Sequence, residues 1–166
     1  GAIVEESVVA DALRVSRTPV REALSELAGE GLLQYERNRG YRTPLFALQD
    51  MRDFFDTAGA VYPVVFAAAA RKRSPEDIAR MAGHLDALGG LARLEDYRER
   101  VRRYRAYMLG IARATRNRFH LPVMRGLVDA HVMLRVDFAS AADAATRESE
   151  MHRNLAVYQE IFDAIE

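Results

Sequence analysis

The chain has 166 residues, of which 49% are hydrophobic and 29% charged, so it can bury a core and remain soluble. Its 24 Lys and Arg residues balance 24 Asp and Glu residues, which excludes a disordered, strongly charged chain and argues neither for nor against nucleic-acid binding. The absence of cysteine excludes disulfide scaffolds, thiolate zinc sites and cysteine nucleophiles. No apolar run approaches the ~20 residues of a membrane span, so we expect a cytoplasmic protein without membrane contacts.

Two short helices joined by a tight turn are predicted near the start of the chain. Residues 5–13 have a helical pattern, and the apolar side of this helix consists of Val4, Val8, Val9 and Leu13. Ser16 follows the turn and can cap a second helix, in whose first turn Pro19 is tolerated because no N–H is needed there. Gly29 and Gly31 end this second helix.

A β-hairpin is predicted next. Short segments at 33–36 and 41–43 flank a tip that contains Asn38 and Gly40, which is typical of a tight turn between two strands. Helix, sharp turn, helix and hairpin together make a winged helix-turn-helix. We therefore expect residues 1–45 to form a domain of this type.

The remaining residues, 46–166, have the pattern of long amphipathic helices. Five helices are predicted, with patterns that start near Leu48, Ser74, Leu94, Phe119 and Ala145. Phe55 is expected to face inward from the first of them, Pro63 lies within the same helix, and Ser74 is expected to cap the second. Short connections predict an antiparallel all-α bundle, so the expected fold is mainly α, with a winged domain followed by a bundle.

The segment from Val15 to Leu24, VSRTPVREAL, closely resembles the recognition-helix signature of the GntR family of bacterial transcription regulators. Short motifs on either side extend the match: Glu6 and Ala10 in the family's L-x-E-x-x-L-A pattern, Glu30-Gly31-Leu32 in its E-G-L, and Arg39-Gly40 in the R-G of the wing tip. Arg14 departs from the family, which usually has Gly in this turn, and destabilises the turn if positive φ is needed there. The five-helix region is similar to the FCD ligand-binding domain of the FadR-type branch.

This resemblance also has implications for the two ends of residues 1–166. Aligned with the family, Gly1 falls just after the first helix of the winged domain, and Glu166 falls before the last helix of the FCD domain. The resemblance therefore implies that both terminal helices are missing from this stretch of sequence.

Polar side chains at the start of the second helix and at the hairpin tip suit DNA. Hydroxyl and backbone N–H groups at a helix N-terminus bind phosphate, and Arg21 suits a guanine edge. The candidate DNA-binding residues are Ser16, Arg17, Thr18, Arg21, Arg37, Arg39 and Gly40. The resemblance assigns contacts to four of them, namely Arg17, Thr18, Arg21 and Gly40. Ordinary solvated charges are the alternative, because residues 1–45 hold six arginines and seven acidic residues.

Many FCD domains hold a metal ion through Asp-x3-His on one helix and two later histidines. Aligned on residues 114–117, which are similar to the family's A-S-x-N, the Asp position falls on Tyr104 and the first His on Met108. His152 matches the second His, whereas His131 is interpreted as a satisfied core histidine. A neutral phenol is a poor ligand and a thioether selects soft ions, so we expect neither a metal ion nor another cofactor.

Two interpretations of this inward-facing region stay open. Tyr104 and Met108 can be plain core packing, or they can line an effector pocket that has exchanged its metal for an apolar wall. The family's pocket Arg and Glu align with Ala58 and Tyr62, so the arginine that would pair a carboxylate is absent, and Arg135 is the candidate to replace it. The candidate pocket residues are Tyr62, Tyr104, Met108, Arg135 and His152, and the expected effector is apolar.

The favoured function is a sequence-specific transcription regulator, namely a repressor that a small-molecule effector releases from operator DNA. A homodimer on a palindromic operator is expected, because one winged domain reads too few base pairs. The alternative is a DNA-binding dimer whose bundle has lost effector and metal binding and serves only dimerisation. An enzyme is not expected, since the sequence has no nucleophile–base pair, no H-E-x-x-H motif and no Gly-rich phosphate loop.

Overall fold

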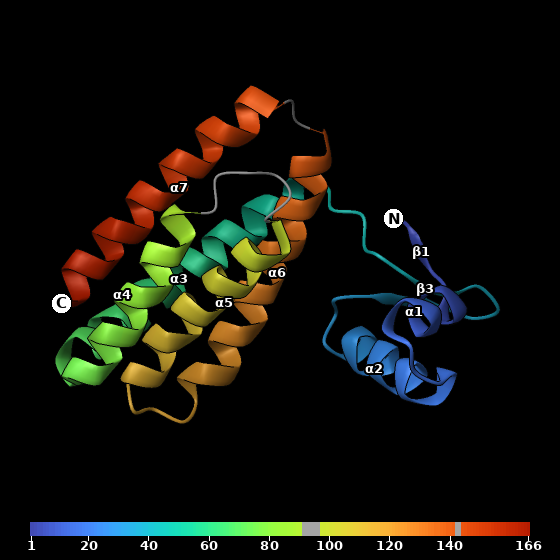
Figure 1. Ribbon diagram of the computed structural model, residues 1–166, viewed down its shortest axis with the longest axis horizontal. Helices are drawn as coiled ribbons and strands as arrows, with labels where there is room; N and C mark the ends of the chain where they lie inside the picture. The colour runs from blue at the N-terminus through green and yellow to red at the C-terminus, as the bar shows by residue number, and fades with distance from the viewer. Residues whose placement is uncertain (91–96, 142–143) are drawn as a thin grey trace. The chain divides into compact units, whose positions relative to one another are not determined.

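The computed structural model describes residues 1–90, 97–141 and 144–166. It divides into two compact units, Gly1–Leu48 and Gln49–Glu166. The first unit combines two helices with a small sheet, and in the residues described the secondary-structure elements of the second unit are all helices (Figure 1). The predicted fold class, a winged helix-turn-helix followed by a helical bundle, is therefore confirmed. Among the described residues, no helix is both long and apolar enough to cross a membrane.

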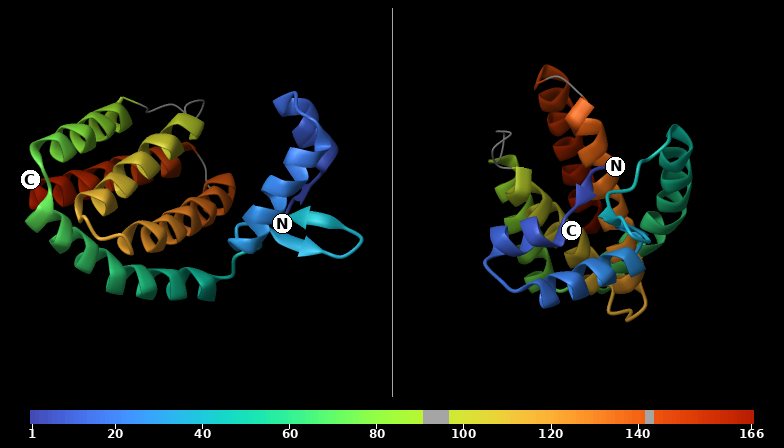
Figure 2. Two further views of the ribbon diagram at one scale, coloured as in Figure 1. Left: turned by 90° about the horizontal axis from the view of Figure 1, so that it is seen from below. Right: turned by 90° about the vertical axis from the view of Figure 1, so that its right-hand side faces the viewer.

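The first unit is built on a three-stranded antiparallel sheet in the order β1-β3-β2. Its elements are β1 (Ile3–Val4), α1 (Glu6–Leu13), α2 (Arg17–Gly29), β2 (Gln34–Glu36) and β3 (Gly40–Arg42). Figure 2 shows the β2–β3 hairpin, in which Tyr35 is paired with Tyr41. The pairing of Val4 with Tyr41 corrects the sequence prediction, which placed Val4 on the apolar side of the first helix. A two-residue strand is too short to have a recognisable period.

The core of this unit is small and consists of Ala10, Val20, Leu24, Leu33 and Tyr41. Val8 and Leu13, which the sequence assigned to the apolar side of α1, are both exposed. The prediction was wrong for these two residues because α1 packs on α2 through the face that carries the small residue Ala10.

Arg14 joins the two helices in the left-handed conformation, with φ 55° and ψ 45°. Its N–H donates to the carbonyl of Asp11 at 3.3 Å, and the N–H of Val15 donates to that of Ala10 at 3.1 Å. The turn therefore does need positive φ, the conformation that glycine adopts with the least strain.

The second unit contains five helices in the residues described: α3 (Leu48–Lys72), α4 (Pro75–Gly89), α5 (Tyr97–Ala114), α6 (His120–Ala141) and α7 (Ala144–Ile165). The predicted start of the third helix at Leu94 lies outside the described residues. Helix α3 continues through Pro63. Helix α4 packs against α5 and α7, and α5 packs against α6.

Large apolar side chains from all five helices form the core of the bundle. The most deeply buried are Val65, Met81, Tyr107, Met108, Ile111, Met124 and Val128. Phe54, and not Phe55 as predicted, faces inward from α3, whereas Phe55 is 57% exposed. Phe54 is four residues before the buried Ala58 and so shares its face of the helix.

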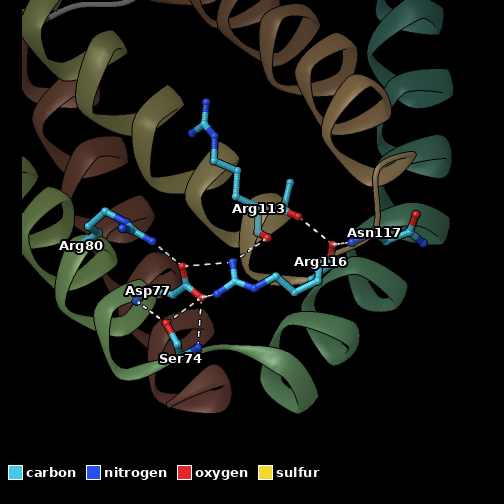
Figure 3. Close-up of polar contacts among 8 residues, drawn as sticks. Ser74, Asp77, Arg80, Arg113, Arg116 and Asn117 are labelled. Carbon is cyan, nitrogen blue, oxygen red and sulfur yellow. Dashed lines mark hydrogen bonds and ion pairs between the residues drawn. The ribbon is translucent and has the colours of Figure 1, made fainter.

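A buried carboxylate links the start of α4 to the connection between α5 and α6 (Figure 3). Asp77 is 2% exposed and forms a capping box with Ser74, whose backbone N–H donates to Asp77 at 3.0 Å. Arg80 and Arg116 also donate to this carboxylate, Arg116 through Nη2 at 2.6 Å. Burial alone would raise the pKa of Asp77, but the Ser74 N–H and the two arginines outweigh it and hold the pKa below its ordinary value. The cap predicted at Ser74 is confirmed.

Candidate nucleic-acid interface and bundle centre

The N-terminus of α2 is open to solvent. Ser16 occupies the N-cap position with extended backbone, but its side chain makes no capping hydrogen bond, and the first turn contains no acidic residue. Arg17 and Thr18 follow and are exposed. Backbone N–H groups at an uncapped helix start, together with hydroxyl groups and a cation, form a site suited to phosphate.

Arg21 lies one turn further along α2, on the same side as Arg17. Its guanidinium makes a bidentate pair with Glu6 of α1, with Nε 3.0 Å from Oε1 and Nη2 2.9 Å from Oε2. This hydrogen bonding raises the pKa of Arg21 and lowers the pKa of Glu6. Sequence analysis did not assign Glu6 to the site, because the contact joins residues 15 apart on two helices.

The wing presents a second exposed cationic segment. Arg37 and Arg39 are exposed at the hairpin tip, and Gly40 has φ 81°. The N–H of Arg39 donates to the carbonyl of Glu36 at 3.0 Å and closes the turn. The Glu36 carboxylate forms ion pairs with Arg39 and Arg42.

The ion pairs of the winged unit engage some of its arginines and not others. Among residues 1–48, all of which the structure describes, the ion pairs use only two of the acidic residues, Glu6 and Glu36. No ion pair engages Arg17 at the start of α2 or Arg37 at the wing tip. Arg17 and Arg37 are thus exposed at two of the candidate DNA-binding positions without an ion-pair partner among residues 1–48.

Aromatic side chains from different helices meet in the centre of the bundle. The hydroxyl of buried Tyr104 on α5 is 2.6 Å from Nδ1 of His131 on α6. The Tyr104 ring lies 5.3 Å from the ring of Tyr158 on α7, and the His131 ring lies 5.4 Å from that of Phe54 on α3. Nη1 of Arg135 donates to the Tyr158 hydroxyl at 3.4 Å. His131 is thus a core histidine with a hydrogen-bond partner, as predicted.

The histidine and tyrosine side chains of this cluster are kept uncharged near neutral pH. Burial, assisted by the Arg135 charge, lowers the pKa of His131 to about 4. Burial likewise raises the pKa of Tyr104 well above its ordinary value and that of Tyr62 to about 12. The Tyr62 hydroxyl is buried without a hydrogen-bond partner of good geometry among the described residues, although the Tyr104 hydroxyl is close enough to affect its pKa.

The five candidate pocket residues do not all meet. Tyr62 and Tyr104 interact, Arg135 reaches the cluster through Tyr158, and Met108 is buried one turn beyond Tyr104 in the same core. His152 is exposed on α7, so the expectation that it faces inward was wrong. Tyr158 faces the cluster instead, and its separation of six positions from His152 corresponds to a rotation of about 120° around the helix.

Two hollows lie elsewhere in the molecule. One of about 430 Å³ is on the wing and is lined by Gly1, Ile3, Glu36, Arg39, Gly40, Tyr41 and Arg42. The other, of about 400 Å³, is an apolar groove between α3 and α7, lined by Phe66, Ala67, Ala70, Val157, Glu160, Ile161, Ala164 and Ile165. Neither includes the tyrosine–histidine cluster. In the part of the chain that the structure describes, no three His, Asp or Glu side chains are grouped to hold a metal ion.

Solved structures of three bacterial proteins have a similar fold, and each comparison covers 99% of this chain. E. coli McbR/YncC is 18% identical, with 80% of its chain covered and a TM-score of 0.77. A GntR transcriptional regulator from Rhodococcus sp. RHA1 is 24% identical, with 82% covered and a TM-score of 0.62. Streptococcus agalactiae GntR is 16% identical, with 79% covered and a TM-score of 0.54. A comparison with curated protein sequences gives no match.

Two family models match the sequence. The model for bacterial regulatory proteins of the gntR family matches residues 1–42, and the FCD domain model matches residues 53–166. The first match contains α1, α2 and the wing, and the second contains the helices that supply the aromatic cluster. This family consists of transcription regulators and not of enzymes. The chain therefore belongs to the GntR family of DNA-binding transcription regulators, in the FadR-type branch that carries an FCD domain.

Proposed function

We propose that this regulator is a repressor that binds operator DNA as a homodimer and releases it when a small apolar effector enters the bundle. The DNA-binding residues in this proposal are Ser16, Arg17, Thr18, Arg21, Arg37, Arg39 and Gly40. The observation that carries it is the open start of α2, where Arg17 and Thr18 are exposed beside backbone N–H groups that no side chain caps.

The two arginines of α2 have different roles in this proposal. Arg17 lies at the helix start, where it and the free N–H groups bind a phosphate and fix the position of the domain on the duplex. Arg21 lies one turn further in, and it reads a guanine edge in the major groove. Arg37, Arg39 and Gly40 bring the wing against the backbone or the minor groove.

The effector site in this proposal is the aromatic cluster of the bundle. The rings of Tyr62, Tyr104 and Tyr158 supply apolar walls, and the Tyr62 hydroxyl and Arg135 supply the few polar groups that orient a ligand. An aromatic molecule with a single acceptor group fits this chemistry better than a polyanion, because one half-buried arginine offers one charge-assisted contact.

A second function is supported by a specific observation. The Tyr104 ring centroid lies 5.4 Å from that of His131 and 5.3 Å from that of Tyr158, and the Tyr104 hydroxyl is hydrogen-bonded to His131. Rings in contact leave little space between them, since protein interiors tolerate few voids. In this alternative the bundle has no effector and serves only dimerisation.

The DNA-binding assignment can be tested with the full chain and a duplex that it selects from a random pool. Arg17→Ala is expected to weaken binding to selected and random duplexes by similar factors and to reduce the salt dependence. Arg21→Ala is expected to weaken mainly the selected duplex, roughly 5- to 150-fold for a lost guanine contact. Arg52→Ala, an exposed arginine of α3, is the matched control. Unchanged affinities in both α2 variants would contradict the assignment.

The effector step is tested by titrating the bound operator duplex with phenylacetate, as an aromatic monoacid, and with citrate, as a polyanion. Release by phenylacetate that is lost in Arg135→Ala supports the repressor with an effector pocket. Failure of a wider panel of aromatic acids to release DNA or to raise the thermal midpoint of the bundle supports the alternative. The oligomeric state is measured separately by sedimentation in each mixture.

A further inference from the structure

The Glu6–Arg21 pair has an asymmetric environment. The Glu6 side chain is 27% exposed and sits at the first position of α1, whereas the Arg21 side chain is 67% exposed. Nε of Arg21 lies 3.0 Å from Oε1 and 3.1 Å from Oε2, and Nη2 lies 2.9 Å from Oε2. The carboxylate is therefore the fixed partner, and the guanidinium projects from it toward solvent.

The geometry leaves part of the guanidinium available. Arginine has five N–H donors, and Glu6 engages the Nε–H and one N–H of Nη2. Both N–H groups of Nη1 and the second N–H of Nη2 remain, and these form the end of the fork. A guanine edge accepts two parallel hydrogen bonds on O6 and N7, which this end of the fork can donate. Arg21 can thus hold Glu6 and a guanine at the same time.

Holding Arg21 in this way has a physical benefit and a drawback. A long arginine loses rotamer entropy when it is immobilised on DNA, and a carboxylate that fixes it beforehand removes part of that loss. The same carboxylate adds a negative charge near the phosphate backbone, which opposes binding to any duplex. The two effects together lower affinity for random DNA and favour the duplex whose guanine meets the fixed fork.

We propose that Glu6 is a specificity-determining residue, which positions the Arg21 guanidinium so that its free edge reads one guanine in each operator half-site. This inference rests on the proposed function, since it takes Arg21 to be the base-reading residue. It assigns Glu6 a role in base discrimination, and not only in joining α1 to α2.

The test compares Glu6→Gln with Glu5→Gln in the full chain. Glu5 is the exposed preceding residue, and its side chain makes no capping bond to α1, so Glu5→Gln removes the same charge without touching Arg21. Each variant is titrated with a duplex selected by the wild-type chain from a random pool and with a random duplex. The ratio of the two Kd values measures discrimination, and thermal unfolding checks the fold.

Glu6→Gln is expected to reduce discrimination about 2- to 12-fold per half-site, the range for one side chain that must be ordered on binding. Its affinity for the random duplex is expected to stay equal or rise, as in Glu5→Gln, which should keep its discrimination. In an Arg21→Ala background, Glu6→Gln should have no further effect on the ratio, because the two residues act as one unit. Replacing the guanine that Arg21 reads by 7-deazaguanine removes the N7 acceptor. This replacement should weaken operator binding more in the wild-type chain than in the Glu6→Gln or Arg21→Ala variants.

Several results would overturn the role of Glu6. These are full discrimination in Glu6→Gln, an equal loss of affinity for both duplexes, and an effect that persists in the Arg21→Ala background. Unchanged discrimination in Arg21→Ala itself would remove Arg21 as the base reader and Glu6 with it, while DNA binding through Arg17 could still stand. Failure of the wild-type chain to select any duplex would contradict the proposed function as a whole.

Discussion

The winged unit and the helical bundle carry candidate sites of opposite kinds. In the winged unit the side chains proposed to contact DNA are exposed and lie within a ten-residue segment and a hairpin tip. In the bundle, the cluster of Tyr62, Tyr104, His131 and Tyr158 is largely buried and takes one residue from each of four helices. A surface site of the first kind depends on local structure, whereas the second kind depends on packing.

Because of this difference, we expect substitutions in the two units to have different consequences. Arg17 of α2 is exposed and makes no ion pair within residues 1–48, so Arg17→Ala is expected to affect DNA binding and to have little effect on stability. A buried polar group in the bundle holds several helices at once, and its loss leaves partners without hydrogen bonds. Four measurements test this contrast.

The largest effect is expected at Asp77, whose carboxylate holds two arginines and the start of α4. Asp77→Ala should lower the free energy of unfolding of the bundle by about 3 kcal/mol, near the low end for a broken buried ion pair because both arginines are half-exposed or more. Urea unfolding measures the change. Asp86→Ala, an exposed site on the same helix, should change it by less than about 0.5 kcal/mol. A loss below about 1 kcal/mol at Asp77 would contradict this account.

The second largest effect is expected on acidification, which should lower the stability of the bundle more than that of the winged unit. The pKa of His131 is lowered from its ordinary 6.5 to about 4, so the unfolded chain binds a proton more readily than the folded bundle between these pH values. Neutral His131 therefore contributes fully to the free energy of unfolding above pH 6.5. This contribution, up to about 3 kcal/mol, is lost as the pH falls from 6.5 toward 4.

Unfolding followed at several pH values tests this prediction, with His131→Gln as the variant that cannot titrate. Between pH 6.5 and 4, the free energy of unfolding should fall less steeply with pH in His131→Gln than in the wild-type chain. Residues 1–48 contain no histidine, so the winged unit should be much less sensitive between pH 6.5 and 5. An equal slope in the variant would show that His131 does not govern the acid sensitivity of the bundle.

A smaller effect of opposite sign is expected in the winged unit. Arg14→Gly should raise its free energy of unfolding by about 1 kcal/mol, because glycine adopts the φ of 55° without the strain of a Cβ atom. Arg17→Gly, the same chemical change at a helical position, should lower stability instead. Denaturant unfolding of both variants decides the matter, and a destabilised Arg14→Gly would refute the strain argument.

The smallest effect is expected from divalent metal ions. Zinc, nickel or manganese should neither raise the thermal midpoint of the bundle nor stay bound after dialysis, because Tyr104 and Met108 align with the Asp and the first His that hold the metal in many FCD domains. Elemental analysis of tag-free protein measures the metal content. One ion per chain that is lost in His152→Ala would show that the bundle has kept a metal site.

The amino-acid sequence by itself determined the features that depend on interactions between residues close together in the chain. The signature from Val15 to Leu24 identifies the recognition helix, and the Asn-Gly spacing identifies the wing. The family's usual Gly at the position of Arg14 points to a turn that can need positive φ, and Arg14 does adopt it. Ser74 predicts the cap that starts α4. Each of these features involves residues within a few positions of each other, so propensity and backbone sterics are enough to specify them.

Only the tertiary structure decided which side chains meet across elements. Glu6 pairs with Arg21, Tyr158 and not the predicted His152 faces the bundle centre, and Phe54 and not Phe55 faces inward. All three outcomes depend on how each helix is rotated about its own axis relative to its neighbours. Neighbouring positions on a helix differ by about 100° in direction, and an apolar pattern leaves that direction uncertain by at least as much. Packing against the other helices removes this uncertainty, because only one rotation of each helix fills the core without voids.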